Sequence, residues 1–210
     1  MIYKMLMLPI VVCCLLTQTD QASAATVFSN LGQTGVGSLA IASDSWRAER
    51  FYTGTNADGY LLNSIQFQLG TAIGMPSGFS LAIYDRNASI PGNLLQSLVG
   101  SEPSGNGVFT FQSSGLALQP NSAYFIVATA TTPLAAGSFQ WEITSWVDQT
   151  HVFDFSAGGL LFESVDGHAW TYSRPNNFLF AVDATAIPEP SALALLALSG
   201  SLIAAARNRG

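Results

Sequence analysis

Four carboxylates in the second half of the chain are the residues whose type best suits catalysis: Glu142, Asp148, Asp154 and Glu163. A suitably spaced pair would cleave glycosidic bonds, because one carboxyl group protonates the leaving oxygen while the other acts as nucleophile or base. No serine stands in a Gly-x-Ser-x-Gly pattern, so the nucleophile elbow of a hydrolase is missing. The sequence does not fix the separation of any carboxylate pair, and we expect no enzyme activity.

Aromatic residues gather in the same half of the chain and suggest sugar binding as an alternative. Trp146 and Trp170 each follow a stretch of loop character, and Tyr172 comes two residues after Trp170. Aromatic faces bind sugars through apolar contact, with nearby polar groups adding hydrogen bonds. Trp141 alternates with apolar neighbours and is expected in the core. We expect Trp146, Trp170 and Tyr172 to be the candidate glycan contacts.

Calcium is the metal that an acidic exported domain would most readily hold, because it takes several oxygen ligands from loops. Oxygen-bearing residues at or near expected turns are Asn56, Asp58, Asp148, Asp154 and Asp166. No EF-hand loop or repeated calcium loop is present. The expectation is therefore no obligatory cofactor, with calcium as the alternative.

The stretch Gly35-Val36-Gly37-Ser38-Leu39-Ala40 matches the G-x-G-x-x-A pattern of dinucleotide sites. That pattern binds a pyrophosphate only where it joins a strand to a helix inside a βαβ unit. Here Ser43-Asp44-Ser45 follows without an amphipathic helix. We interpret the stretch as a flexible loop.

The residues between 25 and 186 show short apolar or alternating runs rather than helical periodicity. In Ile65-Gln66-Phe67-Gln68-Leu69 the apolar residues alternate with glutamine, as in a half-buried strand. The expected strands are Thr26–Asn30, Arg47–Thr53, Leu61–Leu69, Phe79–Tyr84, Leu94–Val99, Val108–Gln112, Ala123–Ala130, Phe139–Thr144, His151–Phe155, Leu160–Ser164, Trp170–Tyr172 and Phe178–Asp183.

Turn residues separate these runs throughout the domain. Expected turns are Asn56–Gly59, Ile90–Asn93, Gln119–Asn121, Gly158–Gly159 and Asp166–Gly167. Many short strands with frequent turns predict an all-β fold, an antiparallel β-sandwich of jelly-roll-like order.

The charge of this domain excludes one class of partner. Between residues 25 and 187 four arginines stand against eleven carboxylates, giving a net charge of −7. Nucleic-acid binding needs a basic footprint, so we expect no nucleic-acid partner.

The first 24 residues have the layout of a signal peptide. Lys4 supplies the positive start, residues 5–17 form an apolar run, and Ala22-Ser23-Ala24 is a small-x-small cleavage site. A run of 13 residues is short for a membrane span, which needs roughly 20. Both cysteines, Cys13 and Cys14, would leave with the peptide, so the exported protein would contain no thiol.

The last 24 residues, 187–210, have the layout of a membrane anchor. Residues 192–206 are apolar on all sides and would form a helix of about 23 Å, against a hydrocarbon core of ~30 Å. Arg207 and Arg209 would stop translocation and remain cytoplasmic. We expect a single transmembrane helix, preceded by a stiff proline-containing segment.

The motif Pro188-Glu189-Pro190, the apolar run and the arginines Arg207 and Arg209 together resemble a PEP-CTERM sorting signal. The resemblance covers residues 187–210 and implies recognition of Pro188, Glu189 and Pro190 by an exosortase. It also implies a transient stay in the inner membrane, followed by display on the cell surface or in an exopolysaccharide or biofilm matrix.

Several stretches resemble the choice-of-anchor domain of type R. They are FYTGTNADGYLLNSIQFQL, GFSLAIYD, PGNLLQSL and LQPNSAYFIVA, and span about residues 50–130. This resemblance implies an extracellular β domain and no known activity. The expected organisation is a signal peptide over 1–24, a β-sandwich over 25–186 and a sorting segment over 187–210. The expected function is non-enzymatic, with carbohydrate binding to exopolysaccharide as the alternative and a secreted glycosidase as the less favoured one.

Overall fold

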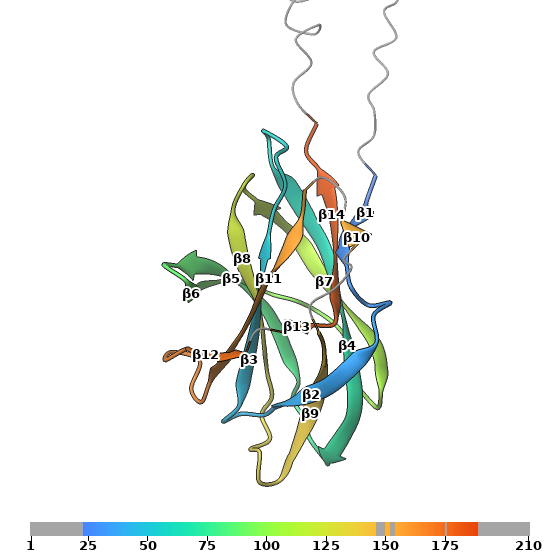
Figure 1. The fold of residues 1–210 in the computed structure, drawn as a ribbon, viewed down its shortest axis with the longest axis vertical. Coiled ribbons are helices and arrows are strands. Elements are labelled where there is room, and N and C mark those ends of the chain that lie inside the picture. Colours follow the sequence, from blue (N-terminus) through green and yellow to red (C-terminus); the bar gives the residue numbers. More distant parts are fainter. Residues whose placement is uncertain (1–22, 146–149, 152–153, 175, 189–210) are drawn as a thin grey trace, which may run out of the picture.

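The computed structural model describes residues 23–145, 150–151, 154–174 and 176–188, and within them every regular element is a β-strand. Eight strands form one sheet (Figure 1). They are β10 (Thr150–His151), β1 (Ala25–Ser29), β14 (Phe180–Ala186), β4 (Tyr60–Gly74), β9 (Gly137–Thr144) and β13 (Asn177–Phe178), with β2 (Gly35–Ile41) on β9 and β7 (Gly107–Leu118) on β4.

The other six strands form a second sheet, with all pairings antiparallel in both sheets. Its order is β12 (Thr171–Arg174), β11 (Ser156–Ser164), β3 (Trp46–Tyr52), β8 (Ala123–Thr129), β5 (Ser80–Asn87) and β6 (Ile90–Ser97). The prediction of an all-β, antiparallel fold is confirmed, and two sheets with a shared core are consistent with a β-sandwich.

The main core lies between the two sheets and is rich in aromatic side chains. Phe67 of β4 contacts Phe79, Phe111 and Trp141, with ring centroids 5.1–5.8 Å apart. Trp141 also stacks on Phe178, with ring centroids 3.9 Å apart. As expected from the alternation around Gln66 and Gln68, Ile65, Phe67 and Leu69 of β4 point into this core.

A second, smaller apolar cluster lies on the opposite face of the six-stranded sheet. In β8, Ile126 belongs to the main core, whereas its neighbours Phe125 and Val127 belong to the second cluster. Successive strand residues point to opposite faces, so this sheet is apolar on both sides. The other buried members are Ala48, Phe162 and Trp170, flanked by Trp46, Tyr84, Ile90 and Leu160.

Three expectations about strands and turns are wrong. The stretch from Gly35 to Ala40 is not a loop but most of β2, which pairs with β9 over Gly35–Ile41. Gly158–Gly159 is not a turn but lies within β11, where the register shifts and Gly159 has φ 63°. The turn expected at Ile90–Asn93 occurs earlier, at Ala88 with φ 53°, and β6 begins at Ile90.

Close approach of side chains from the neighbouring strand explains these glycines better than turn formation does. A Cβ on Gly158 would lie 2.7 Å from Nε of Arg50. A Cβ on Gly35 would lie 3.1 Å from Oε2 of Glu142. A glycine in the sequence can indicate either a turn or the close approach of a neighbouring strand. Only the position of the neighbouring strand in the structure distinguishes the two. Of the strand expected over His151–Phe155, His151 lies in β10 (Thr150–His151), whereas Asp154 has φ 61° and Phe155 is not in a strand. Val152 and Phe153 lie outside the described residues.

Candidate functional site

The segment Pro188-Glu189-Pro190, which the sequence predicts to be a sorting motif, begins at the edge of the described structure. Pro188 is described and exposed, whereas Glu189, Pro190, Arg207 and Arg209 lie outside the described residues. The signal peptide, which was also expected to be helical, and the expected transmembrane helix fall outside the described residues as well. Among the residues that the structure does describe, no helix is long and apolar enough to cross a membrane.

The residue before the motif is fixed to the sandwich. The Ile187 N–H donates to Gly59 O at 3.0 Å, and Asn56 Nδ2 donates to Ile187 O at 2.9 Å. Gly59 has φ 80°, and a Cβ there would lie 2.4 Å from Leu118 O, so only glycine fits this turn. The described chain is therefore hydrogen-bonded to the sandwich as far as Ile187, the residue before Pro188.

The amino-terminal strand, β1, lies beside the last strand, β14. β1 and β14 are antiparallel, and Ala25 lies opposite Ala184 (Figure 1). Asp183 ties the strands together, because its carboxylate accepts hydrogen bonds from Ser64, Thr26 and Gln66 at 2.6–2.9 Å. Partial burial alone would raise the pKa of Asp183, but these three hydrogen bonds outweigh it and lower the pKa.

The three candidate glycan contacts do not form one surface. Trp146 lies outside the described residues. Tyr172 is 52% exposed, but Trp170 is only 9% exposed and belongs to the second apolar cluster. The expectation that Trp170 is exposed is wrong, because its indole packs on the six-stranded sheet while Nε1 donates to Gly167 O at 3.1 Å.

The loop that carries Trp170 is held by hydrogen bonds to an acidic residue, Asp166. Asp166 Oδ1 accepts the N–H groups of His168 at 2.8 Å and Ala169 at 3.0 Å, and the hydroxyl of Ser164 at 3.0 Å. These hydrogen bonds lower the pKa of Asp166, with the Ala169 N–H as the largest cause. Gly167 has φ 77°, and a Cβ there would lie 2.7 Å from the Trp46 ring.

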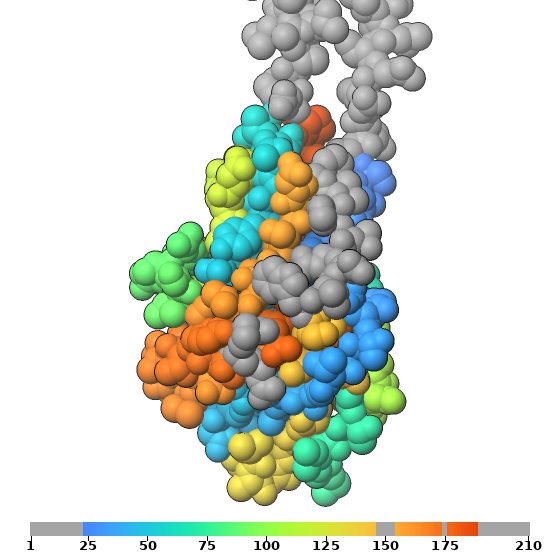
Figure 2. Space-filling view, in the orientation of Figure 1, coloured from blue at the N-terminus to red at the C-terminus, as the bar shows by residue number. Residues whose placement is uncertain are grey.

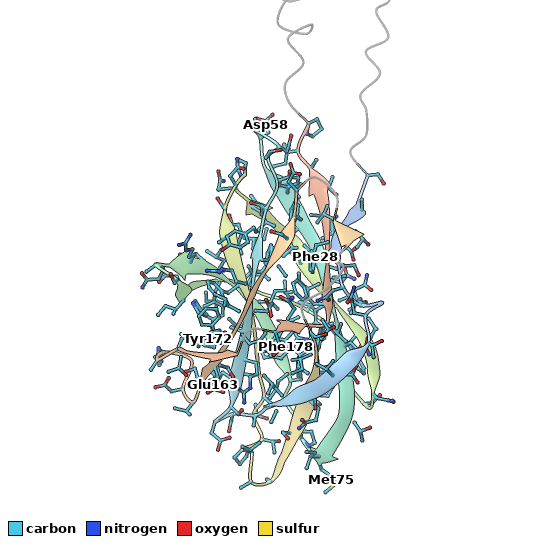
Figure 3. The ribbon with its side chains drawn as sticks, in the orientation of Figure 1. Phe28, Asp58, Met75, Glu163, Tyr172 and Phe178 are labelled. Atoms are coloured by element: carbon cyan, nitrogen blue, oxygen red, sulfur yellow. The ribbon has the colours of Figure 1, made fainter. Side chains whose placement is uncertain are left out.

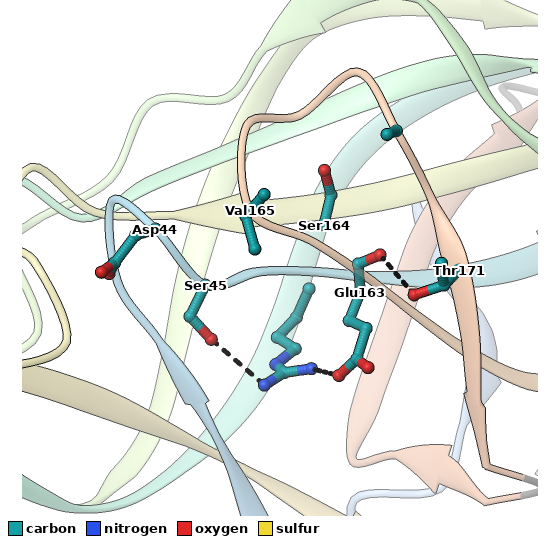
Figure 4. A pocket seen from close by; sticks show the side chains of 8 residues that line it. Asp44, Ser45, Glu163, Ser164, Val165 and Thr171 are labelled. Carbon is teal, nitrogen blue, oxygen red and sulfur yellow. Dashed lines mark hydrogen bonds and ion pairs between the residues drawn. The ribbon is translucent and has the colours of Figure 1, made fainter.

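This loop borders a cavity of about 390 Å³, shown in Figure 4. The cavity lies between the β2–β3 turn and the β11–β12 loop, and three of its residues are charged. Its lining is Asp44, Ser45, Arg47, Glu163, Ser164, Val165, Ala169 and Thr171. Sequence reasoning selected Glu163 only as one of four carboxylates that could form a pair for glycoside cleavage, and did not foresee the cavity.

Arg47 lines the cavity and is held by three partners. It forms an ion pair with Glu163, donates from Nη2 to Ser45 Oγ at 3.1 Å, and donates from Nε to Ala40 O at 2.9 Å. Arg47 and Glu163 are direct cross-strand partners of β3 and β11. The pairing is invisible in the sequence, because 116 residues separate the two side chains.

The chemistry of this cavity suits an uncharged ligand with many hydroxyl groups. The carboxylates of Asp44 and Glu163 can accept hydrogen bonds from ligand hydroxyl groups, whereas the Ser45 hydroxyl already donates to Ala40 O at 3.0 Å. Val165, 71% exposed, adds an apolar contact at the rim. An anionic ligand would meet two carboxylates and one arginine already paired with one of them, so the cavity favours neutral ligands.

The carboxylates considered for glycoside cleavage are not brought together as one pair. Glu142 lies on β9 and accepts Gln68 Nε2 at 2.6 Å, whereas Glu163 lies on β11 of the other sheet. Asp154 accepts the Thr55 hydroxyl at 3.4 Å, and Asp148 lies outside the described residues. The structure thus offers these residues separate partners.

The described part of the chain contains no group of three or more His, Cys, Asp or Glu side chains able to hold a metal ion. Of the residues considered for calcium, Asn56 donates its amide to Gly59 O and Ile187 O. The carboxylate of Asp166 accepts hydrogen bonds from backbone N–H groups of its own loop. Asp148 lies outside the described residues, so the calcium alternative stays a prediction there.

Sequence reasoning missed a buried acid, Glu49. Its side chain points into the core from β3, where Phe51 shares its face, and the residue is fully buried. Oε2 accepts the Phe178 N–H at 3.1 Å, but Oε1 has no hydrogen-bond partner. Burial raises the pKa of Glu49 well above its usual value, although the Phe178 hydrogen bond and Arg50 oppose the rise. The position of Glu49 two residues before Phe51 was the available signal.

Comparison with known proteins identified no relative of this chain. No protein-family model, curated protein or solved structure matches the chain. The fold class therefore rests on the strand pairing, and function must be inferred from the geometry above.

Proposed function

We propose that the chain is an exported, non-enzymatic protein of the cell surface or extracellular matrix, sorted through its PEP-CTERM signal. A signal peptide over residues 1–24 directs export. Residues 192–206 hold the protein in the inner membrane until an exosortase acts near Pro188-Glu189-Pro190. The β-sandwich, of jelly-roll-like order and choice-of-anchor type R, is then displayed or released into a biofilm matrix.

The observation that best supports this proposal is that the first strand begins, and the last strand ends, at the same end of the sandwich. β1 begins beside the end of β14, and Ile187 is hydrogen-bonded to the Asn56–Gly59 turn. A domain tethered there would project its whole length away from the membrane. Cleavage after Ile187 would leave every described strand intact, so processing would not unfold the sandwich.

Cell fractionation tests the sorting step. The wild-type protein is expected outside the inner membrane, whereas a variant with Pro188, Glu189 and Pro190 all changed to alanine should accumulate in it. The physical reason is that the apolar run stays in the bilayer when no cut releases it. Equal distribution of both proteins would contradict a role for the motif.

Carbohydrate binding is the second candidate, favoured by the cavity of about 390 Å³ beside Glu163. Its hydroxyl and carboxylate groups match the hydrogen-bonding needs of a neutral polysaccharide. Tyr172 lies next to Thr171 in β12, but alternate strand residues face opposite sides. The cavity, and not Tyr172, is therefore the first place to test.

A glycan array probed with the exported protein identifies the neutral glycan that binds it. Glu163→Gln is expected to weaken the binding of that glycan about tenfold or more. The change replaces a charged acceptor by a neutral amide oxygen, so a hydrogen bond worth roughly 1.5–3 kcal/mol becomes one worth about 0.5–1.5 kcal/mol. Titration calorimetry measures the affinity. Glu142→Gln, on the other sheet, is the matched control and should leave it unchanged. Absence of any array signal, or equal loss in both variants, would reject the cavity as a glycan site.

A further inference from the structure

One arginine of the six-stranded sheet is nearly buried but has no partner for its charge. Arg50 of β3 is 9% exposed, and its Nε has no hydrogen-bond partner. Among the described residues the one ion pair joins Arg47 to Glu163, so no described carboxylate neutralises Arg50. Burying a charge is unfavourable unless a counter-charge or hydrogen bonds compensate it. An unpaired, nearly buried guanidinium therefore indicates a partner from outside the described chain.

The sheet is shaped to hold the Arg50 side chain. The register between β3 and β11 shifts here, so that residues 158–160 of β11 lie opposite this one residue of β3. A Cβ on Gly158 would lie 2.9 Å from Cβ of Arg50 and 2.7 Å from its Nε. Glycine leaves the space that the arginine occupies, so the bulge in β11 accommodates a side chain that contributes no ion pair to the fold.

The acidic residues of the neighbouring backbone are engaged elsewhere. Glu49 points to the opposite face of the sheet, where its Oε2 accepts the Phe178 N–H at 3.1 Å. Burial raises the pKa of Glu49 more than this hydrogen bond and the charge of Arg50 lower it. Asp154, which precedes β11, accepts the Thr55 hydroxyl at 3.4 Å. The guanidinium of Arg50 is thus left for an anion from another molecule.

Arg50 lies on the outer face of the six-stranded sheet, which carries the second apolar cluster. Its cross-strand partner in β8 is Phe125, a member of that cluster, and cross-strand partners share a face. The guanidinium carbon lies 5.0 Å from the ring centroid of Tyr52. This cation–π contact orients the guanidinium without neutralising its charge. The two edges of the sheet, β6 in green and β12 in orange, both lie on the left of Figure 2.

An exposed aromatic ring lies on the same face of the sheet. Tyr172 is the strand partner of Phe162, another member of the second cluster, and is 52% exposed. Figure 3 shows Tyr172 on the β12 side of the molecule, apart from Phe178 in the core. Only β11 separates β12 from β3, so the two strands run about 10 Å apart, at ~4.8 Å per strand spacing. A chain-like ligand can therefore contact Tyr172 and Arg50 at once.

These two side chains specify the chemistry of the ligand. A guanidinium binds a carboxylate through two parallel hydrogen bonds, and an exposed tyrosine ring offers an apolar face to a sugar. The net charge of −7 between residues 25 and 187 repels a densely charged polymer. A polysaccharide with widely spaced carboxylates avoids most of this repulsion and still provides the counter-charge.

We propose that Arg50 binds the carboxylate of a uronic-acid sugar in a polysaccharide that lies across the outer face of the six-stranded sheet. Tyr172 contacts a neighbouring sugar of the same polysaccharide. This site is separate from the cavity beside Glu163, whose chemistry favours neutral ligands. The encounter with such a polysaccharide outside the cell rests on the proposed function. Binding supplies the counter-charge that the described residues do not give to Arg50.

Titration calorimetry with the full chain, solubilised in detergent, tests the proposal. The probe is an oligosaccharide of alternating glucuronic acid and N-acetylglucosamine. The same oligosaccharide with its carboxyl groups reduced to alcohols is the neutral comparison. The acidic probe should bind about tenfold more tightly or better, because its hydrogen bonds to the guanidinium are charge-assisted. Its affinity should fall as sodium chloride is added, because salt screens the ion pair.

Arg50→Met is expected to weaken binding of the acidic probe about tenfold or more, with no loss of thermal stability. Methionine fills a similar space, and the buried charge that it removes has no partner in the described fold. Arg86→Met is the matched control, because Arg86 is an exposed arginine of β5, and it should leave the affinity unchanged. Tyr172→Ala should weaken binding about two- to tenfold, through the lost ring contact.

If Arg50→Met does not fold, Arg50→Lys keeps the charge without the planar fork and should still weaken binding severalfold. Absence of binding by the acidic probe, equal binding of the acidic and neutral probes, or an affinity unaffected by the Arg50 variants would overturn the proposal. Arg50-dependent binding of polyglutamate without binding of the oligosaccharide would assign Arg50 to an acidic protein partner instead. Neither sorting nor the cavity beside Glu163 enters this test, so its failure is distinguishable from failure of the proposed function.

Discussion

Glu49→Gln is expected to stabilise the protein at neutral and alkaline pH and to flatten the dependence of its stability on pH. Glu49 is fully buried, its Oε1 has no partner, and its pKa is raised well above 4.5 by burial. Glutamine keeps the shape and an oxygen that accepts the Phe178 N–H, but it cannot ionise.

The sign follows from proton linkage. Because the folded-state pKa of Glu49 is raised, the folded protein binds one proton more than the unfolded chain at pH values between the two pKa values. The stability from this group is complete below about pH 4.5 and is lost as the pH rises through the folded-state pKa. Over that window the free energy of unfolding should fall by up to about 1.4 kcal/mol per pH unit.

Urea unfolding at a series of pH values from 4 to 9 measures this effect. The wild type and Glu49→Gln should differ little near pH 4 and diverge as the pH rises. Glu142→Gln serves as the control, because Glu142 is only partly buried and bonded to Gln68. A wild-type curve parallel to that of Glu49→Gln would show that Glu49 is not a buried neutral acid.

Trp170→Ala is expected to destabilise the protein by about 3–5 kcal/mol, the usual cost of removing a large buried aromatic residue. Trp170 packs in the second apolar cluster with Phe125 and Phe162, and Nε1 donates to Gly167 O. Its loss would uncover the outer side of β8 and leave a cavity. Chemical denaturation monitored by circular dichroism measures the change in the free energy of unfolding.

Tyr172→Ala is the matched comparison, because Tyr172 is 52% exposed and lies only two residues away. Its effect should remain within about 1 kcal/mol. If Trp170→Ala unfolds the protein completely, Trp170→Phe retains part of the packing and should cost less. Equal and small effects of both alanine variants would mean that Trp170 is not a core residue.

The sequence was sufficient to predict the fold class, because alternation depends only on neighbours in the chain. Gln66 and Gln68 mark the outer face of β4, while the apolar residues between them mark the core. The same reasoning placed Trp141 in the core, where it stacks on Phe178. Element type follows from such local patterns, even where boundaries shift by several residues.

Features that depend on distant strands were not predictable. Gly35 and Gly158 suggested a loop and a turn, but both lie in strands where a partner approaches closely. Trp170 follows a turn, which suggested that its side chain is exposed. It is buried instead, because it packs against the outer face of the six-stranded sheet. A sheet that is apolar on both faces gives no clean alternation to warn of this.

The candidate site shows the same limit. Glu163 was recognisable as a carboxylate, but its pairing with Arg47 depends on the register between β3 and β11. Glu49 looked like one more charged residue on a strand, and only the packing of Phe178 above it shows that it is buried. The sequence did not reveal the partner of Glu163 or the burial of Glu49, because the environment of a side chain depends on the tertiary structure.

The intact mass of the protein, recovered from each fraction of its own host, tests the central claim most directly. A mass that lacks residues 1–24 and the segment after the sorting motif, found outside the inner membrane, is the predicted result. A mass that retains residues 187–210 and is confined to the membrane fraction would contradict the account, because the tail would then be a permanent anchor.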